Sequence, residues 1–376
     1  LLGAPIVVFV DLANSFLGAG HEITLSQAGS FFYMFLPLVS TMIGMCMLWI
    51  VGKWKGIKEG WFPCLITGTV IGIVSYFTNH YDNLVVLTGV ICGVAVIIAM
   101  IVYLKAQKLN VIDRSRLTKE ELQLEKDFPL WKALSPWLIL IVLILMMNIP
   151  KPVFTFLYRE LKLPITGLTA NGAPLDTRAL WQAYTWIFAS IVLSLPILRP
   201  SGKQLTDSVK VWLRRAPRPV YSAAIFFAIG EVMNMAGYSM SQKTFAVPSM
   251  VKVLADYSAQ FFNGAYGAIV AFIGLFGGFI TGSEASTIAM FAKYTLTTAQ
   301  NLQLGLGGMI IITAGLAFGG GLASVISPAK LQNAAASIDK LGEENHVIRI
   351  AFVFSLILTA VTAAFVVVYL AATGGR

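Results

Sequence analysis

Long apolar segments dominate this chain and leave it few ways to fold. A helix needs about 20 mostly apolar residues to cross the hydrocarbon core of a bilayer. Nine segments approach or exceed that length: residues 28–52, 60–78, 84–104, 134–150, 179–198, 219–240, 264–281, 305–325 and 347–372. Two further apolar stretches, 1–18 and 284–300, are short or broken, which is typical of half-helices and re-entrant turns. We therefore expect an all-α polytopic membrane protein with about nine to eleven transmembrane or re-entrant helices.

The composition supports a membrane protein and argues against soluble chemistry. Charged residues make up 12% of the chain, about half the share in a soluble domain. Three cysteines lie in apolar surroundings without CxxC spacing, and three histidines are widely scattered, so we predict no metal site and no cofactor. The sequence contains no phosphate-binding GxxxxGK[ST] loop and no evident pairing of nucleophile and base. We therefore expect no enzyme, and we attribute the net charge of +9 to membrane loops rather than to nucleic-acid binding.

Lysine and arginine are distributed unequally between alternate loops. Loops 53–59, 105–133 and 199–219 together hold 16 of these residues, whereas loops 79–83, 151–178 and 241–263 hold 6. Excess Lys and Arg marks the cytoplasmic side, so we place the first set there. We treat residues 1–376 as one transmembrane transport domain that contains the cytoplasmic loop 105–133. Within that loop Thr118 and Glu121 fit a capping box, which predicts a short surface helix.

The chain lacks an initiator Met and begins inside an apolar run from Leu1 to Val10. We therefore expect a fragment whose N-terminal part is missing.

Two apolar segments near the C-terminal end are interrupted by polar, helix-breaking residues. The first break reads Thr281-Gly282-Ser283, and the second reads Ser327-Pro328 after a glycine run at 319–321. Backbone polar groups in lipid must be paired, so such breaks persist only where protein or a wet cavity surrounds them. Paired breaks are the best sequence indication of a secondary transporter's substrate site.

The residues at these breaks suit a small anion. An unwound segment offers free N–H groups and hydroxyl donors, and the N-terminus of a half-helix adds partial positive charge. Lys330 would add a full positive charge beside the second break. The predicted substrate-binding residues here are Thr281, Gly282, Ser283, Ser286, Thr287, Ser327, Pro328 and Lys330.

Ionisable side chains at membrane depth are rare and usually functional. Glu284 directly follows the first break, and a carboxyl group in a poorly solvated cavity takes up a proton more readily. We predict that it carries the coupling proton; the simpler interpretation is a helix cap or a partner of Lys330. Glu231 and Asn234, one turn apart on one helix face, are the second choice for proton coupling. The depth of Asp11 stays open, and Lys293 is expected to snorkel to the membrane surface.

Several short motifs follow one another in a recognisable order. They are Trp54-Lys55-Gly56-Ile57, Ser135-Pro136-Trp137-Leu138, Leu163-Pro164-Ile165-Thr166-Gly167-Leu168, Val232-Met233-Asn234, Gly278-Phe279-Ile280-Thr281-Gly282-Ser283, and Gly320-Gly321 followed by Ile326-Ser327-Pro328. Together they resemble the lactate permease family of secondary transporters, over nearly the whole chain. The resemblance implies a multi-pass protein of a prokaryotic plasma membrane that carries L-lactate, D-lactate or glycolate with protons.

The resemblance also implies an inverted repeat in the complete protein. On that basis Gly3 and Pro5 would be the first half's counterpart of the second break, and would add to the substrate site. This chain departs from the family pattern at several positions. Glu284 stands where the family usually has Asp or Asn. After Ser327-Pro328 the family tends to have Gln, whereas this chain has Ala329-Lys330, and Glu231 replaces a residue that is usually uncharged. These changes reshape the cavity, so the exact carboxylate stays open.

Two alternatives remain beside proton symport of a small hydroxy-monocarboxylate by alternating access. Sodium could be the coupling ion, held by carbonyl groups at the breaks and by Glu284. Alternatively, the chain could be a non-transporting integral membrane subunit of a larger complex, which predicts cofactor ligands and no solute accumulation. The expected partners are a small carboxylate and the lipid bilayer, but not nucleic acid. Whether the protein forms a homo-oligomer is left open.

Overall fold

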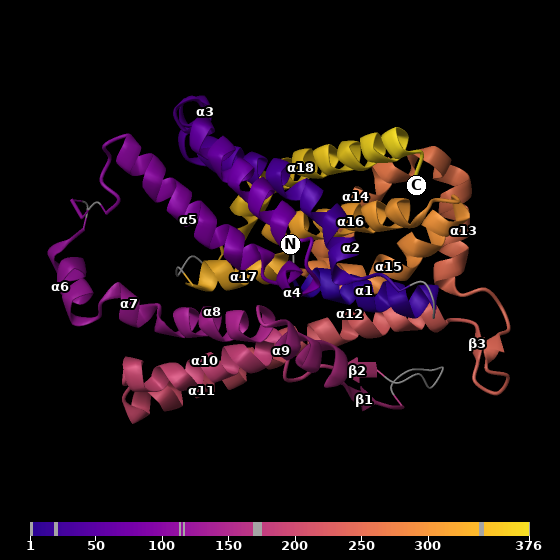
Figure 1. The fold of residues 1–376 in the computed structure, drawn as a ribbon, viewed down its shortest axis with the longest axis horizontal. Helices are drawn as coiled ribbons and strands as arrows, with labels where there is room; N and C mark the ends of the chain where they lie inside the picture. Colours follow the sequence, from indigo (N-terminus) through magenta and orange to yellow (C-terminus); the bar gives the residue numbers. More distant parts are fainter. Residues whose placement is uncertain are drawn as a thin grey trace. The chain divides into compact units, whose positions relative to one another are not determined.

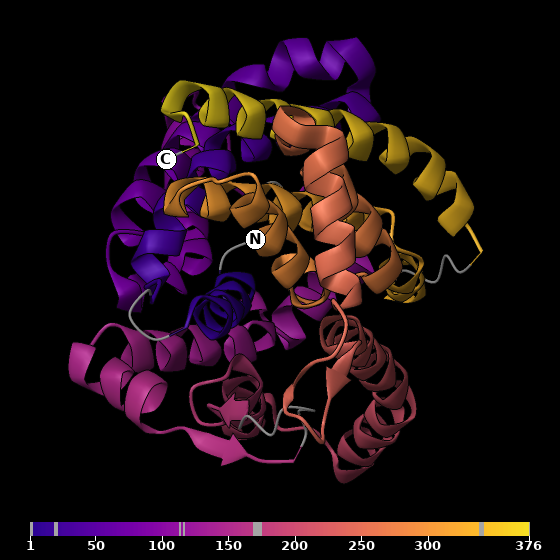
Figure 2. The same ribbon diagram turned by 90° about the vertical axis from the view of Figure 1, so that its right-hand side faces the viewer.

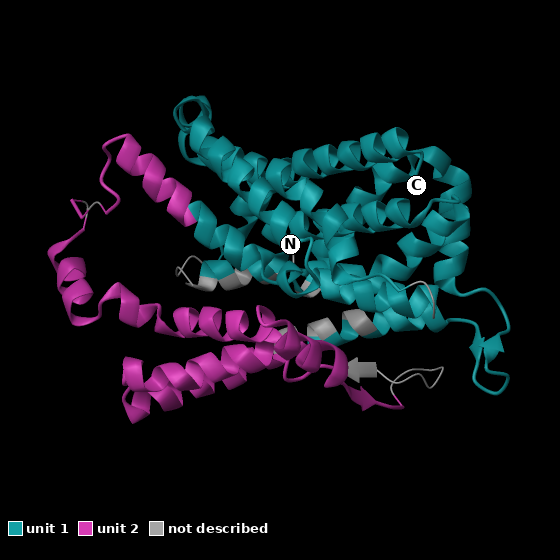
Figure 3. Ribbon diagram, viewed as in Figure 1, with its two compact units in different colours: residues 1–96, 221–376 teal, residues 97–220 magenta. Residues whose placement is uncertain are grey.

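The structure is a computed structural model that describes residues 3–18, 22–112, 114–115, 117–167, 175–337 and 342–375. The described residues are mostly helical, which confirms the predicted all-α polytopic membrane fold (Figure 1). The chain divides into two compact units, residues 1–96 with 221–376 and residues 97–220 (Figure 3). The assignment of residues 1–376 to one transport domain stays a prediction.

The first unit contains the beginning and the end of the chain. Its elements are α1 (Ala4–Leu17), α2 (Leu25–Phe32), η1 (Tyr33–Phe35), α3 (Leu36–Thr78), α4 (Asp82–Val85), the first part of α5 (Thr88–Ala106), most of α12 (Pro217–Met235), β3 (Tyr238–Ser239), β4 (Thr244–Phe245), α13 (Met250–Phe262), η3 (Asn263–Ala265), α14 (Tyr266–Thr281), α15 (Glu284–Asn301), α16 (Leu306–Leu322), η4 (Ala323–Val325), α17 (Pro328–Ser337) and α18 (Glu344–Thr373). The strands β3 and β4 form a short antiparallel pair.

The second unit contains the middle of the chain. Its elements are the rest of α5, α6 (Lys119–Asp127), α7 (Leu130–Ala133), α8 (Ser135–Asn148), α9 (Lys151–Thr155), the π-helical turn η2 (Phe156–Glu160), β1 (Leu163–Ile165), β2 (Leu175–Thr177), α10 (Ala183–Leu198), α11 (Gly202–Arg215) and the start of α12. The strands β1 and β2 pair antiparallel, with Leu163 opposite Thr177.

Every segment predicted to span or re-enter the membrane is helical over most of its length. By length and apolarity, five helical stretches of the described chain could each cross a membrane: Leu25–Thr78, Thr88–Ala106, Met250–Thr281, Leu306–Val325 and Glu344–Thr373. A sixth is added if Ser135–Asn148 and Lys151–Glu160, which meet at 87°, form one broken span. The number is smaller than predicted because α8 and α10 are short, because α12 is not among the five, and because Leu25–Thr78 counts once.

Helix α3 is a helical hairpin rather than one straight rod. Lys53 has φ 52° and ψ −142°, which breaks the helix there, and Figure 1 shows the chain turning sharply. A Cβ added at Gly44 would meet Cys64, and one added at Gly60 would meet Leu48. These contacts show that the two arms of α3 run antiparallel. The two arms match the predicted spans 28–52 and 60–78. The predicted loop 53–59 is wrong in extent, because residues 54–59 are already helical.

The surface helix predicted in loop 105–133 is confirmed as α6. Thr118 caps its N-terminus, and Glu121 completes the capping box. The Thr118 backbone N–H and hydroxyl lie 2.7 and 3.0 Å from the Glu121 carboxylate. These hydrogen bonds hold the pKa of Glu121 below its usual value.

Helices α14, α16 and α18 form the packed centre of the first unit (Figures 1 and 2). Lipid tails are as apolar as leucine, so helices associate in a membrane mainly through close packing, which small residues permit. Here a Cβ at Gly274 would overlap the Leu316 carbonyl group, and one at Gly319 would overlap the Ala271 carbonyl oxygen. The backbones of α14 and α16 therefore touch where only glycine fits.

Residues from the N-terminal region complete this centre. Phe35 stacks on Phe318 of α16, with ring centroids 4.7 Å apart. Phe365 of α18 meets the same Phe35 ring at 4.7 Å. Helix α1 packs along α15, and α2 packs against α16. The first unit thus joins segments more than 200 residues apart in the sequence.

In the second unit, α8 and α10 pack together beside a sharp break at residues 149–150. Buried Arg178 donates from Nε to the Tyr158 carbonyl oxygen at 2.9 Å, and its guanidinium lies 4.5 Å from the Tyr158 ring centroid. The predicted loop 151–178 is therefore wrong in part, because it contains α9, η2 and the β1–β2 pair.

The contact between α14 and α16 can be tested with Gly319→Ala. The added Cβ would collide with the Ala271 carbonyl oxygen and the Leu275 amide nitrogen. We expect a loss of about 1–3 kcal/mol of stability, typical of overpacking, measured as a lower thermal midpoint in detergent. Gly93→Ala on α5 is the matched control, since nothing lies within 4 Å of a Cβ there. An equal loss of stability in both variants would contradict the proposed close contact.

Candidate functional site

Both predicted breaks are present, and their helices meet. At the first, α14 ends at Thr281, Gly282 adopts the left-handed conformation (φ 66°), and Ser283 caps the start of α15. At the second, α16 gives way to the 3-10 turn η4, and α17 begins at Pro328. A Cβ at Gly278 would lie 2.7 Å from the Gly320 Cα. The end of α14 therefore lies directly against the end of α16.

The two threonines of the first break stabilise the turn itself. Thr281 Oγ1 accepts a hydrogen bond from the Ser283 N–H at 3.2 Å and lies 3.3 Å from Thr287 Oγ1. Thr287 Oγ1 donates to the Ser283 carbonyl oxygen at 2.9 Å. Ser283 Oγ in turn accepts from the Ser286 N–H at 3.3 Å. Much of the hydrogen-bonding capacity predicted for an anion is therefore used to close the break.

Thr287 also joins the two breaks sterically. A Cβ at Gly320 would meet the Thr287 side chain at 3.1 Å, and one at Gly277 would meet its Cγ2 at 2.8 Å. The first turn of α15 is thus seated between α14 and α16. The Thr287 side chain is fully buried there. Thr287 was predicted to bind substrate through its hydroxyl group, but its methyl group also packs against Gly277 and Gly320.

Ser327 differs from the other hydroxyl groups at the breaks. It is 1% exposed, and its hydroxyl oxygen has no hydrogen-bond partner within the described part of the chain. Its carbonyl oxygen accepts from the Leu331 N–H at 3.0 Å, so the backbone is anchored while the side chain is not. A buried hydroxyl without a partner costs free energy. Ser327 therefore differs from Thr281 and Thr287, whose hydroxyls bond within the turn.

Two opposite charges come from the two breaks. Glu284, the first residue of α15, is buried, and Lys330 of α17 is close enough to interact with it electrostatically. Lys330 is exposed, and its Nζ donates to Ser324 Oγ at 2.8 Å. Ser324 lies at the second break but was not among the predicted substrate-binding residues. Pro328 begins α17 and is exposed.

Glu231 and Asn234, the second choice for proton coupling, lie on α12 near its contact with α15. Gly230 of α12 approaches Ala289 and Met290, whose backbone atoms would lie 3.2 Å from an added Cβ. That contact is five to six residues beyond Glu284, or roughly 8 Å at 1.5 Å per residue. Asn234 lies one turn beyond Gly230, buried, with no partner for its Oδ1 among the described residues. Glu231 beside them is half-buried.

The N-terminal segment reaches the same bundle through α1. Gly3 has φ 103°, which favours glycine, and it precedes α1, which has Pro5 in its first turn. Because α1 packs along α15, the segment joins the helix that carries Glu284. Asp11 on α1 is exposed, and Lys293 on α15 is half-buried.

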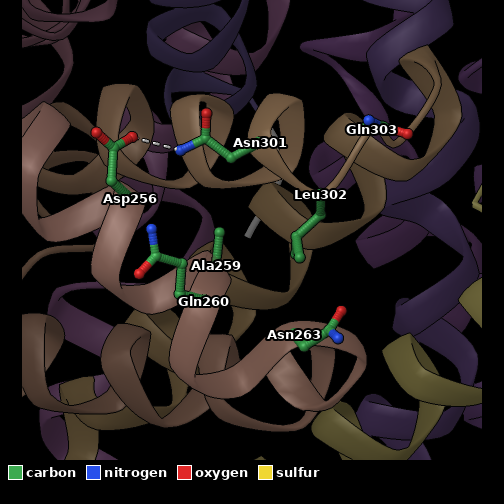
Figure 4. A pocket seen from close by; sticks show the side chains of 7 residues that line it. All are labelled: Asp256, Ala259, Gln260, Asn263, Asn301, Leu302 and Gln303. Carbon is green, nitrogen blue, oxygen red and sulfur yellow. Dashed lines mark hydrogen bonds between the residues drawn. The ribbon is translucent and has the colours of Figure 1, made fainter.

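An open pocket of about 560 Å³ lies at the other end of α15. Figure 4 shows its lining, in which the Asn301 amide donates to Asp256 Oδ1 at 2.7 Å. Asn301 is 17 residues from Glu284, or about 25 Å along a helix. The Asp256 carboxylate would repel a carboxylate ligand. None of the predicted site residues lines this pocket, and sequence reasoning did not predict it.

Comparisons with known proteins find similarity to lactate and glycolate permeases. The family model described as L-lactate permease matches residues 2–371. The L-lactate permease of Escherichia coli K12 is 22% identical over 353 residues, and the glycolate permease GlcA of the same strain is 24% identical over 364 residues. Each alignment covers 87% of this chain and 61% of the relative, so the chain spans about three fifths of their length. No solved structure matches the chain.

The role of the Thr287 hydroxyl can be separated from that of its methyl group. Thr287→Val keeps the shape that fits Gly277 and Gly320 but loses the hydrogen bond to the Ser283 carbonyl oxygen. We expect a loss of about 1 kcal/mol of stability, measured by thermal unfolding in detergent. Ser286→Ala is the control, because the turn uses the backbone N–H of Ser286 and not its hydroxyl. If Thr287→Val were as stable as this control, the hydroxyl would not support the turn.

Proposed function

Because the chain belongs to the L-lactate permease family, we propose that it forms part of a transporter for small 2-hydroxy-monocarboxylates such as lactate or glycolate. On this proposal it is a multi-pass protein of a prokaryotic plasma membrane, a permease rather than an enzyme, driven by protons. The observation that carries the proposal is the meeting of two broken helices around buried Glu284 and Ser327.

The substrate binds at the second break and the start of α15. The Ser327 hydroxyl donates a hydrogen bond to the carboxylate or to the 2-hydroxyl group of the substrate. This buried hydroxyl lacks a partner within the described part of the protein. The N-termini of α15 and α17 add partial positive charge, and Lys330 adds a full one. Thr281, Gly282, Ser283 and Thr287 shape the turn, while Ser286 contributes its N–H to that turn. Gly3 and Pro5 contribute through the packing of α1 against α15.

Glu284 carries the coupling proton. A buried carboxylate beside a bound anion is unfavourable, so the anion is accepted when Glu284 is protonated. The proton and the monocarboxylate together carry no net charge, which lowers the cost of moving them through the closed state. When the proton leaves to the opposite side, the restored negative charge expels the anion. Lys330 moderates this repulsion, because it reaches both Ser324 and the neighbourhood of Glu284.

Alternating access would use the contacts between the helices of the site. The predicted site residues lie at the end of α14, in the first turn of α15 and at the start of α17, and α15 contacts α16 where Thr287 meets Gly320. A small displacement of α15 relative to α16 would therefore change which side of the site is open.

Proton coupling through Glu284 can be tested in liposomes that contain the full-length protein. Labelled L-lactate and glycolate are presented with an inward proton gradient or an inward sodium gradient. We expect accumulation with protons alone, and we expect Glu284→Gln to abolish accumulation while lactate exchange at equal pH persists. Glu231→Gln is the matched control and should still accumulate lactate. Accumulation driven by sodium alone would contradict proton coupling, and the reverse pattern in the two variants would assign the proton to Glu231.

Substrate binding through Ser327 and Lys330 can be tested in the same liposomes by measuring KM. Ser327→Ala and Lys330→Ala should each raise the KM for L-lactate about tenfold or more, since a hydrogen bond to a charged group contributes about 1.5–3 kcal/mol. Lys330→Arg should retain most of the affinity. Ser324→Ala is the control, because it removes the partner of Lys330 and leaves the charge. An unchanged KM in Ser327→Ala and Lys330→Ala would place the substrate elsewhere.

A further inference from the structure

Helix α11 is exposed along its whole length. The predicted loop 199–219 is wrong in part, because a capping box starts a regular helix there. Ser201 Oγ accepts from the Gln204 N–H at 3.2 Å, and the Gln204 side chain accepts from the Ser201 N–H at 2.8 Å. Every residue from Gly202 to Arg215 is exposed.

One face of α11 is apolar. Leu205, Val209 and Trp212 are spaced i, i+4 and i+7, and Leu213 follows at i+8, so they share one side of the helix. Trp212 is 65% exposed and Leu213 is 57% exposed. No described element packs substantially against this face. A helix with so much uncovered apolar surface requires an apolar environment on that side.

The opposite face is basic. Lys203, Lys210 and Arg214 are spaced so that they share the side away from Val209, and Arg215 adds charge at the end. Asp207 is the one acidic residue between 202 and 215. An apolar face with Trp and Leu opposite a Lys/Arg face is typical of helices that lie in a membrane surface.

The ends of α11 restrict it to that surface. Three residues, 199–201, separate it from the apolar helix α10, and only Ala216 separates it from α12. Three extended residues reach about 10 Å, so α11 stays close to α10 and to the start of α12, both of which belong to segments predicted to span the membrane. Its loop is also one of the three that the charge distribution assigns to the cytoplasmic side.

We propose that α11 is an interfacial helix that binds anionic phospholipids of the cytoplasmic leaflet. Leu205, Val209, Trp212 and Leu213 lie at the boundary between headgroups and acyl chains. The long side chains of Lys203, Lys210 and Arg214 extend to the phosphate groups. This role does not depend on which carboxylate or coupling ion the protein uses.

The depth of α11 can be measured with spin labels on single cysteines in the full-length protein. Cys46, Cys64 and Cys92 are first replaced by Ser, and cysteine is then placed at each position from 203 to 214 in turn. In vesicles of phosphatidylethanolamine and phosphatidylglycerol, labels at Leu205, Val209 and Leu213 should collide mainly with oxygen. Labels at Lys203, Lys210 and Arg214 should collide mainly with a water-soluble nickel complex. Uniform access of the nickel complex at all positions would overturn the proposal.

The preference for anionic lipid needs a second measurement. The variant K203E/K210E/R214E is compared with K119E/K126E, a charge reversal on α6. Phosphatidylglycerol retained by the purified protein is measured against phosphatidylcholine. One basic residue near an anionic surface raises the binding constant about fivefold. The α11 variant should therefore lose most of the preference for phosphatidylglycerol, and the α6 variant should keep it. An unchanged preference in the α11 variant would show that α11 does not bind anionic lipid.

Discussion

A backbone polar group cannot remain unpaired in hydrocarbon, and the arrangement of the first unit depends on this constraint. Both breaks near the C-terminal end free backbone groups that a continuous helix would satisfy. At the first break, the Thr281 and Thr287 hydroxyls and the Ser283 cap pair with the turn. The break is thus closed by its own hydroxyl residues. Only after that requirement is met are groups left over for a substrate.

Close glycine contacts join α14 and α16. Where helices cannot gain from the hydrophobic effect, close backbone approach supplies the attraction. The approach at Gly274 and Gly319 holds the two helices together, and the approach at Gly278 brings both breaks to the same place. The stability of this contact, and the alternating access that we propose, would depend on the same few residues.

Charge is distributed according to depth. Buried Glu284 interacts electrostatically with Lys330 at the breaks, whereas basic residues gather on exposed α11 and in other loops. Burying a charge without a partner is costly, so few charged groups occur at depth and many at the surface. This separation fits the proposed proton-accepting role of Glu284 and the proposed binding of anionic lipid by α11.

The sequence by itself determined the class of fold, the positions of both breaks, the α6 cap and the family. These follow from local properties: the length of apolar runs, glycine and proline in them, capping residues and motif order. Only the tertiary structure decided which hydroxyls remain for a ligand. Thr281 and Thr287 look equivalent to Ser327 in sequence, yet the first two bond within the turn and Ser327 does not. The antiparallel arms of α3, the meeting of Gly278 with Gly320, and the contact of Gly230 with α15 were likewise not predictable. Each depends on contacts between residues far apart in the chain, and one sequence does not encode such pairings in any local pattern.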